Sequence, residues 1–316
     1  MIGTSLGYSL AKRQIMKQLK FYFAFILLAL TSQFSNAQIK GNGQLETRAF
    51  DMTGIEQIVF NVTVNAEIDL SRSDELFVSV DENLFNHLII EKRGNTLHVD
   101  QKDWIQSKKN INIVFGAQGL KKLTNTAWGN IKLINVDQDS FNAQMNVGSL
   151  QMEGKVETIT VSTNAGKVDL SQLKAGKANA TIEGNGRIVL NADKIDYAGH
   201  GFGQLIYLGM PKLQEKSANT DFSVVSQADY KHQASMPIEF VDVKLKNNTA
   251  RRKNIRFRGP SEKPFGYGTP IGAKAVKHEK FPVGTRIYQT NSTGKDKLLL
   301  TITKENAGQT LQLFKN

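Results

Sequence analysis

The sequence predicts an all-β protein: a right-handed parallel β-helix, preceded by an N-terminal strand region and followed by a small C-terminal β-sandwich. One phrase recurs five times, with Gly followed by a polar residue and by apolar residues at the second and fourth positions. The successive glycines are 19, 18, 20 and 17 residues apart. A near-constant period of this length is typical of a solenoid, in which each repeat stacks on its neighbours. The five glycines are Gly129, Gly148, Gly166, Gly186 and Gly203.

Residues 1–37 are predicted to be a targeting segment. Two lysines precede an apolar run that extends from Phe21 to Leu30, and a polar stretch then ends in small residues. This order is typical of a secretory signal peptide, and the run is too short to span a bilayer. We therefore expect cleavage between Ala37 and Gln38.

Export sets the expected compartment: the periplasm, the outer surface or the extracellular space. We expect translation to start at Met16, with residues 1–15 as an upstream extension and Met1 as the alternative start. The chain contains no cysteine, which excludes disulfides and thiolate metal sites even in an oxidising compartment. Stability must therefore come from burial and backbone pairing.

The net charge of +11 is distributed unevenly along the chain. Residues 38–236 carry 20 basic and 23 acidic side chains, a net charge of −3, whereas residues 237–316 carry 16 basic and 6 acidic, a net charge of +10. This contrast predicts a domain boundary near Pro237 and a C-terminal unit with its own electrostatic character.

The N-terminal part of the mature chain, residues 46–115, is expected to form short strands separated by turns. Apolar residues occupy every second position from Val62 to Leu70, the pattern of a half-buried strand. The stretch from Leu84 to Ile90 is expected to be a short helix at most.

Residues 116–230 are expected to form the coils of a solenoid within a domain of residues 38–236. Side chains alternate along a strand, so the two apolar positions of each phrase should fill the interior while the residue after Gly faces water. Glycine suits a corner that needs a tight turn with little room for a side chain. The apolar Val189 and Ile206 interrupt the outward face, and we expect the C-terminal unit to cover them. Around Phe222 the phrase loses its Gly, as expected of a capping coil.

Residues 237–316 are predicted to form a small basic β-sandwich. Short apolar stretches recur along this segment, separated by polar or glycine-containing breaks, as in compact all-β domains. The densest charge run of the chain lies here, and it is either a contact for an anionic surface or a solvated hairpin edge. It consists of Arg251, Arg252, Lys253, Arg256 and Arg258.

Catalytic and cofactor motifs are not found in the mature sequence, so we predict no enzyme, no cofactor and no metal site. The one nucleophile-elbow match, Gly3 to Gly7, precedes the signal peptide and has no strand before it. The five histidines are scattered singly, without metal-ligand spacing. The best remaining carboxylate pair, Asp193 and Asp196, is interpreted as solvated loop acids.

The order of signal peptide, short strands and Gly-polar-apolar coils resembles a known family. Residues 46–230 are similar to the auto-transporter adhesin "head GIN" family of exported bacterial proteins, whose function is unknown and whose fold is β-helical. Gly184 to Ile188 and Gly201 to Leu205 carry the resemblance most closely. The earlier coils depart from the family pattern, because they keep only the second Gly of its Gly-x-Gly form. The family implies adhesion and supplies no catalytic residues.

The leading functional hypothesis is an exported, non-enzymatic β-solenoid that binds a glycan or an anionic component of the cell envelope. Two alternatives remain open at this point: a polysaccharide lyase or hydrolase on the same fold, and a structural periplasmic scaffold. Nucleic acid is not an expected partner of an exported protein, and Trp128 beside the first repeat glycine is a candidate for stacking on a sugar.

Overall fold

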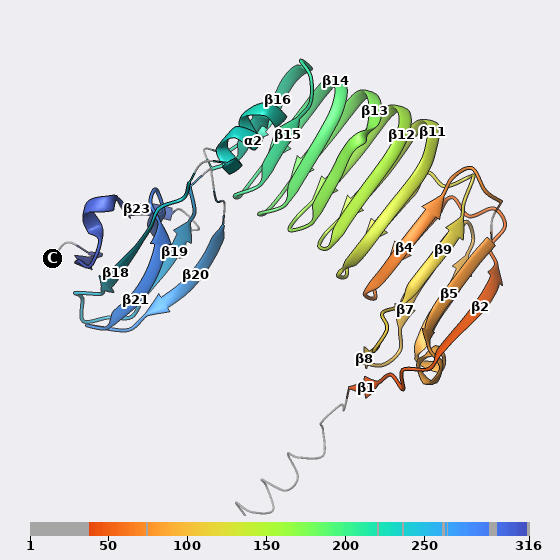
Figure 1. The fold of residues 1–316 in the computed structure, drawn as a ribbon, viewed down its shortest axis with the longest axis horizontal. Helices are drawn as coiled ribbons and strands as arrows, with labels where there is room; N and C mark the ends of the chain where they lie inside the picture. Colours follow the sequence, from red (N-terminus) through yellow and green to blue (C-terminus); the bar gives the residue numbers. More distant parts are fainter. Residues whose placement is uncertain are drawn as a thin grey trace, which may run out of the picture.

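Long parallel strands, stacked side by side, make up most of the molecule (Figure 1). This is a computed structural model, and it describes residues 38–73, 75–219, 221–235, 237–260, 263, 265–290 and 296–314. The predicted all-β class and the β-solenoid are confirmed. The predicted signal peptide, with Ala37, lies outside the described residues, and Gln38 is the first residue described. Among the described residues, no helix is both long and apolar enough to cross a bilayer.

Each repeat forms a strand that bends around the solenoid and pairs in parallel with the next repeat. The pairing register shifts once in each of the first three pairs, where the strand turns from one wall to another. The coil after β14 consists of two shorter strands, and the last coil contributes a single short strand. The strands are β11 (Gly129–Met145), β12 (Ser149–Thr163), β13 (Lys167–Ile182), β14 (Arg187–Gly199), β15 (Gln204–Tyr207), β16 (Lys212–Ala218) and β17 (Ser223–Ser226).

The repeat phrase has the predicted structural role. Nine of the ten apolar positions are buried in one continuous core, and Tyr207 packs partly buried against it. Gly148 lies at a corner with φ 83°, and a Cβ there would lie 2.6 Å from the carbonyl oxygen of Gly129. Any other residue at this corner would therefore be both strained and obstructed. The buried positions are Ile131, Leu133, Leu150, Met152, Val168, Leu170, Ile188, Leu190 and Leu205.

The solenoid contains a coil that the glycine phrase did not indicate. Strands β3 (Gln57–Phe60) and β4 (Val64–Asp69) pair in parallel with β10 (Lys122–Asn125) and with the start of β11. Val64 occupies the register position opposite Gly129. This coil therefore belongs to the same stack, although it lacks the glycine and is separated from β11 in the chain by several other strands.

The N-terminal end of the stack is built out of sequence order. Strands β7 (Thr96–Gln101) and β9 (Asn112–Gly116) pair in parallel with the outer edges of β3 and β4. Antiparallel strands then close this end. Of the stretch expected as a short helix, residues 84–87 lie in a 3-10 helix and residues 88–90 begin a strand. The closing elements are β2 (Leu45–Asp51), β5 (Glu75–Asp81), β6 (Leu88–Arg93), the 3-10 helix η2 (Glu82–His87) and the pair β1 (Ile39–Lys40) with β8 (Ile105–Gln106).

The other end of the solenoid is capped by the predicted degenerate coil and by a helix. Phe222 lies over Gly199, where a Cβ would meet its ring at 2.2 Å, and stacks on Tyr197. Helix α2 (Gln227–Ser235) contacts β15 and β17. Ile206, on the outward side of β15, is only 1% exposed. Helix α2 contacts β15, and the C-terminal unit lies opposite Gln204 on the outward side of the same strand. The expectation that the C-terminal unit covers Val189 and Ile206 stays a prediction.

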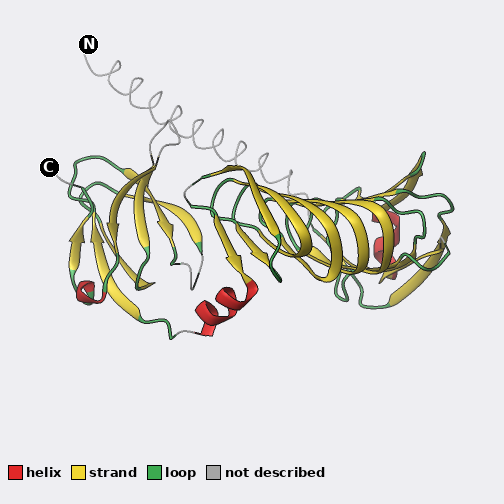
Figure 2. Cartoon of the chain, turned by 90° about the horizontal axis from the view of Figure 1, so that it is seen from above, coloured by secondary structure: helices red, strands yellow, loops and turns green. Residues whose placement is uncertain are grey.

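The C-terminal unit consists of two small sheets that share a second hydrophobic core. It lies beyond the last coils, at the end of the solenoid opposite to β2 and β5 (Figures 1 and 2). One sheet has the order β21-β18-β24 and the other β20-β19-β22-β23. The elements are β18 (Phe240–Lys246), β19 (Lys253–Arg258), β20 (Gly266–Ile271), β21 (Val276–Pro282), β22 (Arg286–Thr290), β23 (Asp296–Thr301), η3 (Lys304–Asn306) and β24 (Thr310–Gln312).

Candidate functional site

The residues that follow the repeat glycines form a straight row across the solenoid. Lys167 is directly paired with Arg187, and Arg187 with Gln204. Neighbouring strands lie about 4.8 Å apart, so side chains at one register position stand next to one another. Toward the N-terminal end the row continues with neutral side chains, where Ser149 Oγ donates to Asn130 Oδ1 at 2.6 Å. The row therefore changes from neutral to basic along the stack.

The basic end of this row faces the C-terminal unit across a cleft of about 660 Å³. We call this space the interdomain cleft. Its solenoid wall includes Lys167, Arg187 and Gln204, and its other wall includes Arg258, at the end of β19, and Arg286, at the start of β22. Segments that are distant in the chain thus build one site.

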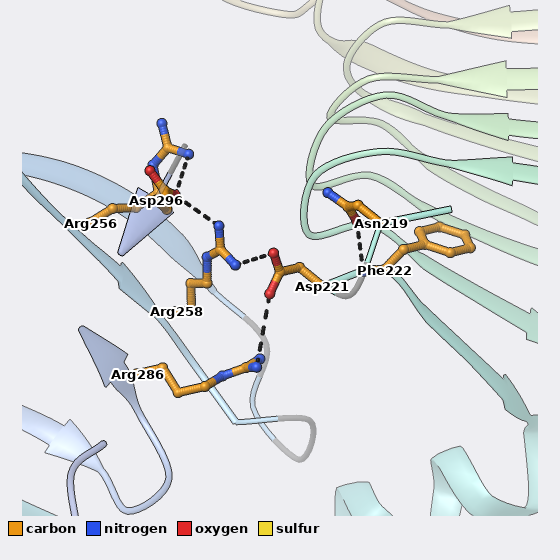
Figure 3. Close-up of polar contacts among 7 residues, drawn as sticks. All are labelled: Asn219, Asp221, Phe222, Arg256, Arg258, Arg286 and Asp296. Atoms are coloured by element: carbon orange, nitrogen blue, oxygen red, sulfur yellow. Dashed lines mark hydrogen bonds and ion pairs between the residues drawn. The ribbon is translucent and has the colours of Figure 1, made fainter. Parts of the chain in front are cut away.

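A buried arginine joins the two walls. Figure 3 shows the guanidinium of Arg258 between Asp221, from the last coil, and Asp296, from β23. It pairs with Asp221 and donates to Asp296 Oδ2 at 2.8 Å. Its Cζ atom lies 4.0 Å from the ring centre of Phe202 and 4.1 Å from that of Tyr288. Such stacking between aromatic rings, with carboxylates in its plane, suits the planar guanidinium better than an ammonium group.

The interdomain cleft carries an excess of positive charge. Four basic residues line it, whereas Asp221 is the only acidic residue among the described residues of its lining. Asp221 is already engaged by Arg258 and, at 3.9 Å, by Arg286. Lys167 and Arg187 form no ion pair with a carboxylate of the described residues, although Arg187 lies 5.0 Å from the ring centre of Tyr230. Cations gathered in a concave site attract anions and concentrate their field there.

Two buried polar atoms beside the cleft lack partners within the described part of the chain. They are Oε1 of Gln204, a residue only 4% exposed, and Nε of Arg258, a residue only 6% exposed. The prediction that every residue after a repeat glycine faces water is therefore wrong for Gln204. An unpaired buried acceptor and an unpaired buried donor both cost free energy.

The structure divides the basic cluster that the sequence singled out. Arg251 and Arg252 are exposed and precede β19, and Lys253 lies near the Phe314 ring. Arg256 and Arg258 share one face of β19, and both contact Asp296. Only Arg258 lines the interdomain cleft.

Sequence reasoning missed the remaining residues of the site. The repeat phrase predicts an outward position for Lys167, Arg187 and Gln204, and the signal for the site is the change from neutral to basic side chains at this position along the stack. Asp221 and Arg286 carry no local signal, because only the packing of the C-terminal unit against the last coil brings them together.

The two acids considered for catalysis do not form a pair. Asp193 is exposed, whereas Asp196 is buried beneath three lysines at 3.2, 3.6 and 3.8 Å. Burial raises the pKa of Asp196, but the hydrogen bond from Lys177 and the charges of Lys177, Lys194 and Lys216 together hold it below its usual value. Asp196 is thus an ionised structural acid. No cluster of potential metal ligands occurs among the residues that the structure describes.

A family model described as "Putative auto-transporter adhesin, head GIN domain" matches residues 54–211, half of the chain. The chain belongs to this family. The head GIN match includes the solenoid wall of the interdomain cleft but ends before Asp221 and the C-terminal unit. The cleft therefore combines a family wall with a wall from outside the matched region.

One solved structure supports the fold of the solenoid, and two others are more distant. A putative adhesin from Bacteroides fragilis is 19% identical with a TM-score of 0.51, and the alignment covers 60% of this chain and 99% of that one. A putative lipid binding protein from Parabacteroides distasonis (20% identity, TM-score 0.40) and a putative adhesin from Parabacteroides merdae (19%, 0.41) each align with 60% of this chain and with 99% and 98% of their own. The likeness to the first shows the fold alone. No curated protein sequence matches this chain.

Proposed function

We propose that this chain is an exported, non-enzymatic binding protein of the cell envelope, and that its interdomain cleft holds an acidic glycan. The observation that carries the proposal is the charge of the cleft, which has four basic residues and one acid that is already ion-paired. Membership of a family named for adhesins supports binding as the activity. The predicted signal peptide supports export.

A glycan is favoured over a simple anion by the uncharged polar residues of the cleft. Asn185 and Ser223 line it beside the cations, and their amide and hydroxyl groups can exchange hydrogen bonds with sugar hydroxyls. Sugar hydroxyls supply donors, and an acidic sugar adds the negative charge that Lys167 and Arg187 attract. A uronic-acid polymer combines both groups in each residue.

The alternative of a polysaccharide hydrolase finds little support in the cleft. Such enzymes use two carboxyl groups placed on either side of the scissile bond. The described lining of the cleft contains one, and Asp221 is paired with two arginines.

The test is affinity electrophoresis of the mature protein through gels that contain polygalacturonate, heparin or neutral dextran, with product analysis in parallel. We expect retardation by the acidic polymers and no cleavage. The double variant Lys167→Ala/Arg187→Ala should weaken binding at least about tenfold, since hydrogen bonds to charged groups are worth about 1.5–3 kcal/mol each.

A matched control is the double variant Lys109→Ala/Lys174→Ala, which removes the same charge from exposed positions outside the cleft. It should bind like the unaltered protein. Equal weakening by both variants would show that binding depends on the net charge of the protein and not on the cleft. Cleavage of any polymer would favour the hydrolase, and retention by none would favour a structural scaffold.

A further inference from the structure

The only two tryptophans of the chain are both exposed. Trp104 and Trp128 have exposed fractions of 62% and 65%. Tryptophan is a large side chain that is highly buried on average. Exposed aromatic side chains that gather in one place mark a binding surface more often than scattered ones do.

The fold places Trp104 in a groove at the N-terminal end of the solenoid, and Trp128 follows directly after a residue that lines the same groove. The groove has a volume of about 320 Å³, and Trp104 lines it together with the corner between β3 and β4. Ala127 lines it as well, and Trp128 is the next residue. Because Gly129 is paired with Val64, Trp128 occupies the corner beside Thr63. Both tryptophans therefore lie near this corner, and Trp104 is the one that belongs to the lining of the groove.

The groove is lined by neutral hydrogen-bonding groups, in contrast to the interdomain cleft. None of the described residues that line it is charged. Within the described part of the chain, the side chains of Thr63, Gln106 and Asn110 make no hydrogen bond, so their hydroxyl and amide groups are unused. The polar lining residues are Asn61, Thr63, Gln101, Gln106, Ser107 and Asn110.

We propose that this groove binds a neutral sugar ring of a glycan. The apolar C–H face of a pyranose stacks on an indole, while its hydroxyls exchange hydrogen bonds with amide and hydroxyl side chains. The volume lies within the range of small-molecule sites. An anionic ligand would find no cation in the described lining, so this site selects a different part of a glycan from the one that the cleft holds. The inference stands independently of the proposed function of the cleft.

The two tryptophans themselves report the test, because their fluorescence is the only tryptophan emission of the protein. The mature chain is titrated with cellohexaose, maltohexaose, mannohexaose and chitohexaose, and the emission spectrum is followed. We expect a saturable shift to shorter wavelength with at least one of these oligosaccharides, as sugar displaces water from the indoles. An emission spectrum unchanged by all four would overturn the proposal.

Single variants assign the signal to the groove. Trp104→Ala and Trp128→Ala each leave one reporter and should weaken the affinity roughly five- to tenfold, the usual worth of one aromatic contact. Both side chains are exposed, so the melting temperature should change little, and this is checked by circular dichroism. An affinity unchanged in both variants would contradict the assignment.

Two further measurements separate this site from the cleft and from self-association. Lys167→Ala/Arg187→Ala should lose acidic-polymer binding and keep the fluorescence response, whereas loss of both would contradict two independent sites. A spectral shift produced by raising the protein concentration alone, without sugar, would show that the tryptophans bind a second copy of the chain instead.

Discussion

Arg258 shows how a single buried charge can hold two parts of a chain together. Its guanidinium is shared between carboxylates from the last coil and from β23, and it lies between two aromatic rings (Figure 3). Removing one partner of a buried ion pair leaves the other charge desolvated, which is more costly than the net worth of the pair.

We therefore expect Arg258→Ala to lower the free energy of unfolding of the C-terminal unit by about 3–5 kcal/mol. Urea denaturation followed by circular dichroism measures this value. Arg256→Ala is the matched control, because its more exposed side chain contacts the same Asp296; it should cost at most about 1 kcal/mol. Equal effects of the two variants would contradict a special role for Arg258.

Asp81 fixes the N-terminal segment to the solenoid through a fully buried carboxylate. It accepts hydrogen bonds from Ser107 Oγ and the backbone N–H groups of Gly43 and Lys108, at 2.5, 2.5 and 2.8 Å. Burial raises its pKa, but these hydrogen bonds outweigh burial and hold the pKa below the usual range of an aspartate. The ionised form therefore stabilises the fold.

Because the pKa of Asp81 is lower in the folded than in the unfolded chain, its contribution is complete above about pH 4, the range in which an unfolded aspartate ionises. The contribution is lost as the pH falls through the folded pKa. We expect Asp81→Asn to reduce the free energy of unfolding at neutral pH and to flatten its decline in acid. Denaturation curves at a series of pH values test this, with the exposed Asp139→Asn as control. An unchanged pH profile in Asp81→Asn would disprove the role.

At the scale of the element, the coil is defined by its inward and outward positions. Ile188 is fully buried in the core column, and Val189 beside it points outward and is half-buried. We expect Ile188→Asp to cost about 4 kcal/mol or more, because it places an unpaired charge in an apolar interior. Val189→Asp should cost much less. Thermal melting of both variants measures the difference, and similar melting temperatures would reverse the assignment of the two faces.

The sequence was informative about the coils because local rules dictate them. The glycine phrase marks a corner and two inward positions. Residues adjacent in the chain determine each of these positions. It missed the coil of β3 and β4, since Val64 takes the corner position without glycine. Gln204 was wrongly expected to face water for a different reason: it lies in a cleft whose other wall is the C-terminal unit, which is distant in sequence.

At the scale of the whole molecule, the two proposed sites lie at opposite ends of the solenoid and differ in charge. The interdomain cleft could not be predicted from sequence, because its walls meet only when the C-terminal unit packs against the last coils. The tryptophan groove was indicated only by Trp128, since Trp104 reaches it through the out-of-order strands β7 and β8.

This difference in charge predicts that salt weakens binding in the cleft but not in the groove. Binding of polygalacturonate in the cleft should weaken steeply as sodium chloride is raised from about 0.05 to 0.5 M, because the Debye length shrinks to a few ångströms. Binding of a neutral hexasaccharide in the groove should change little over the same range. Gel retardation and tryptophan fluorescence at each salt concentration measure the two affinities. A parallel decline of both would show that the same charges serve the two ligands.

The out-of-order strands at the N-terminal end also bear on how the protein folds. From Gly129 onward each coil pairs with the coil that follows it directly in the chain, so each step closes a short loop. By contrast, Val64 must find Gly129, and Asn65 must find Asn112, with several other strands lying between them in the chain. Contacts between distant residues form slowly, because the entropy of closing a long loop is lost before the contacts stabilise it. The N-terminal coil, which would be exported first, is therefore expected to be among the last to fold. It would pair with glycine coils that have already formed.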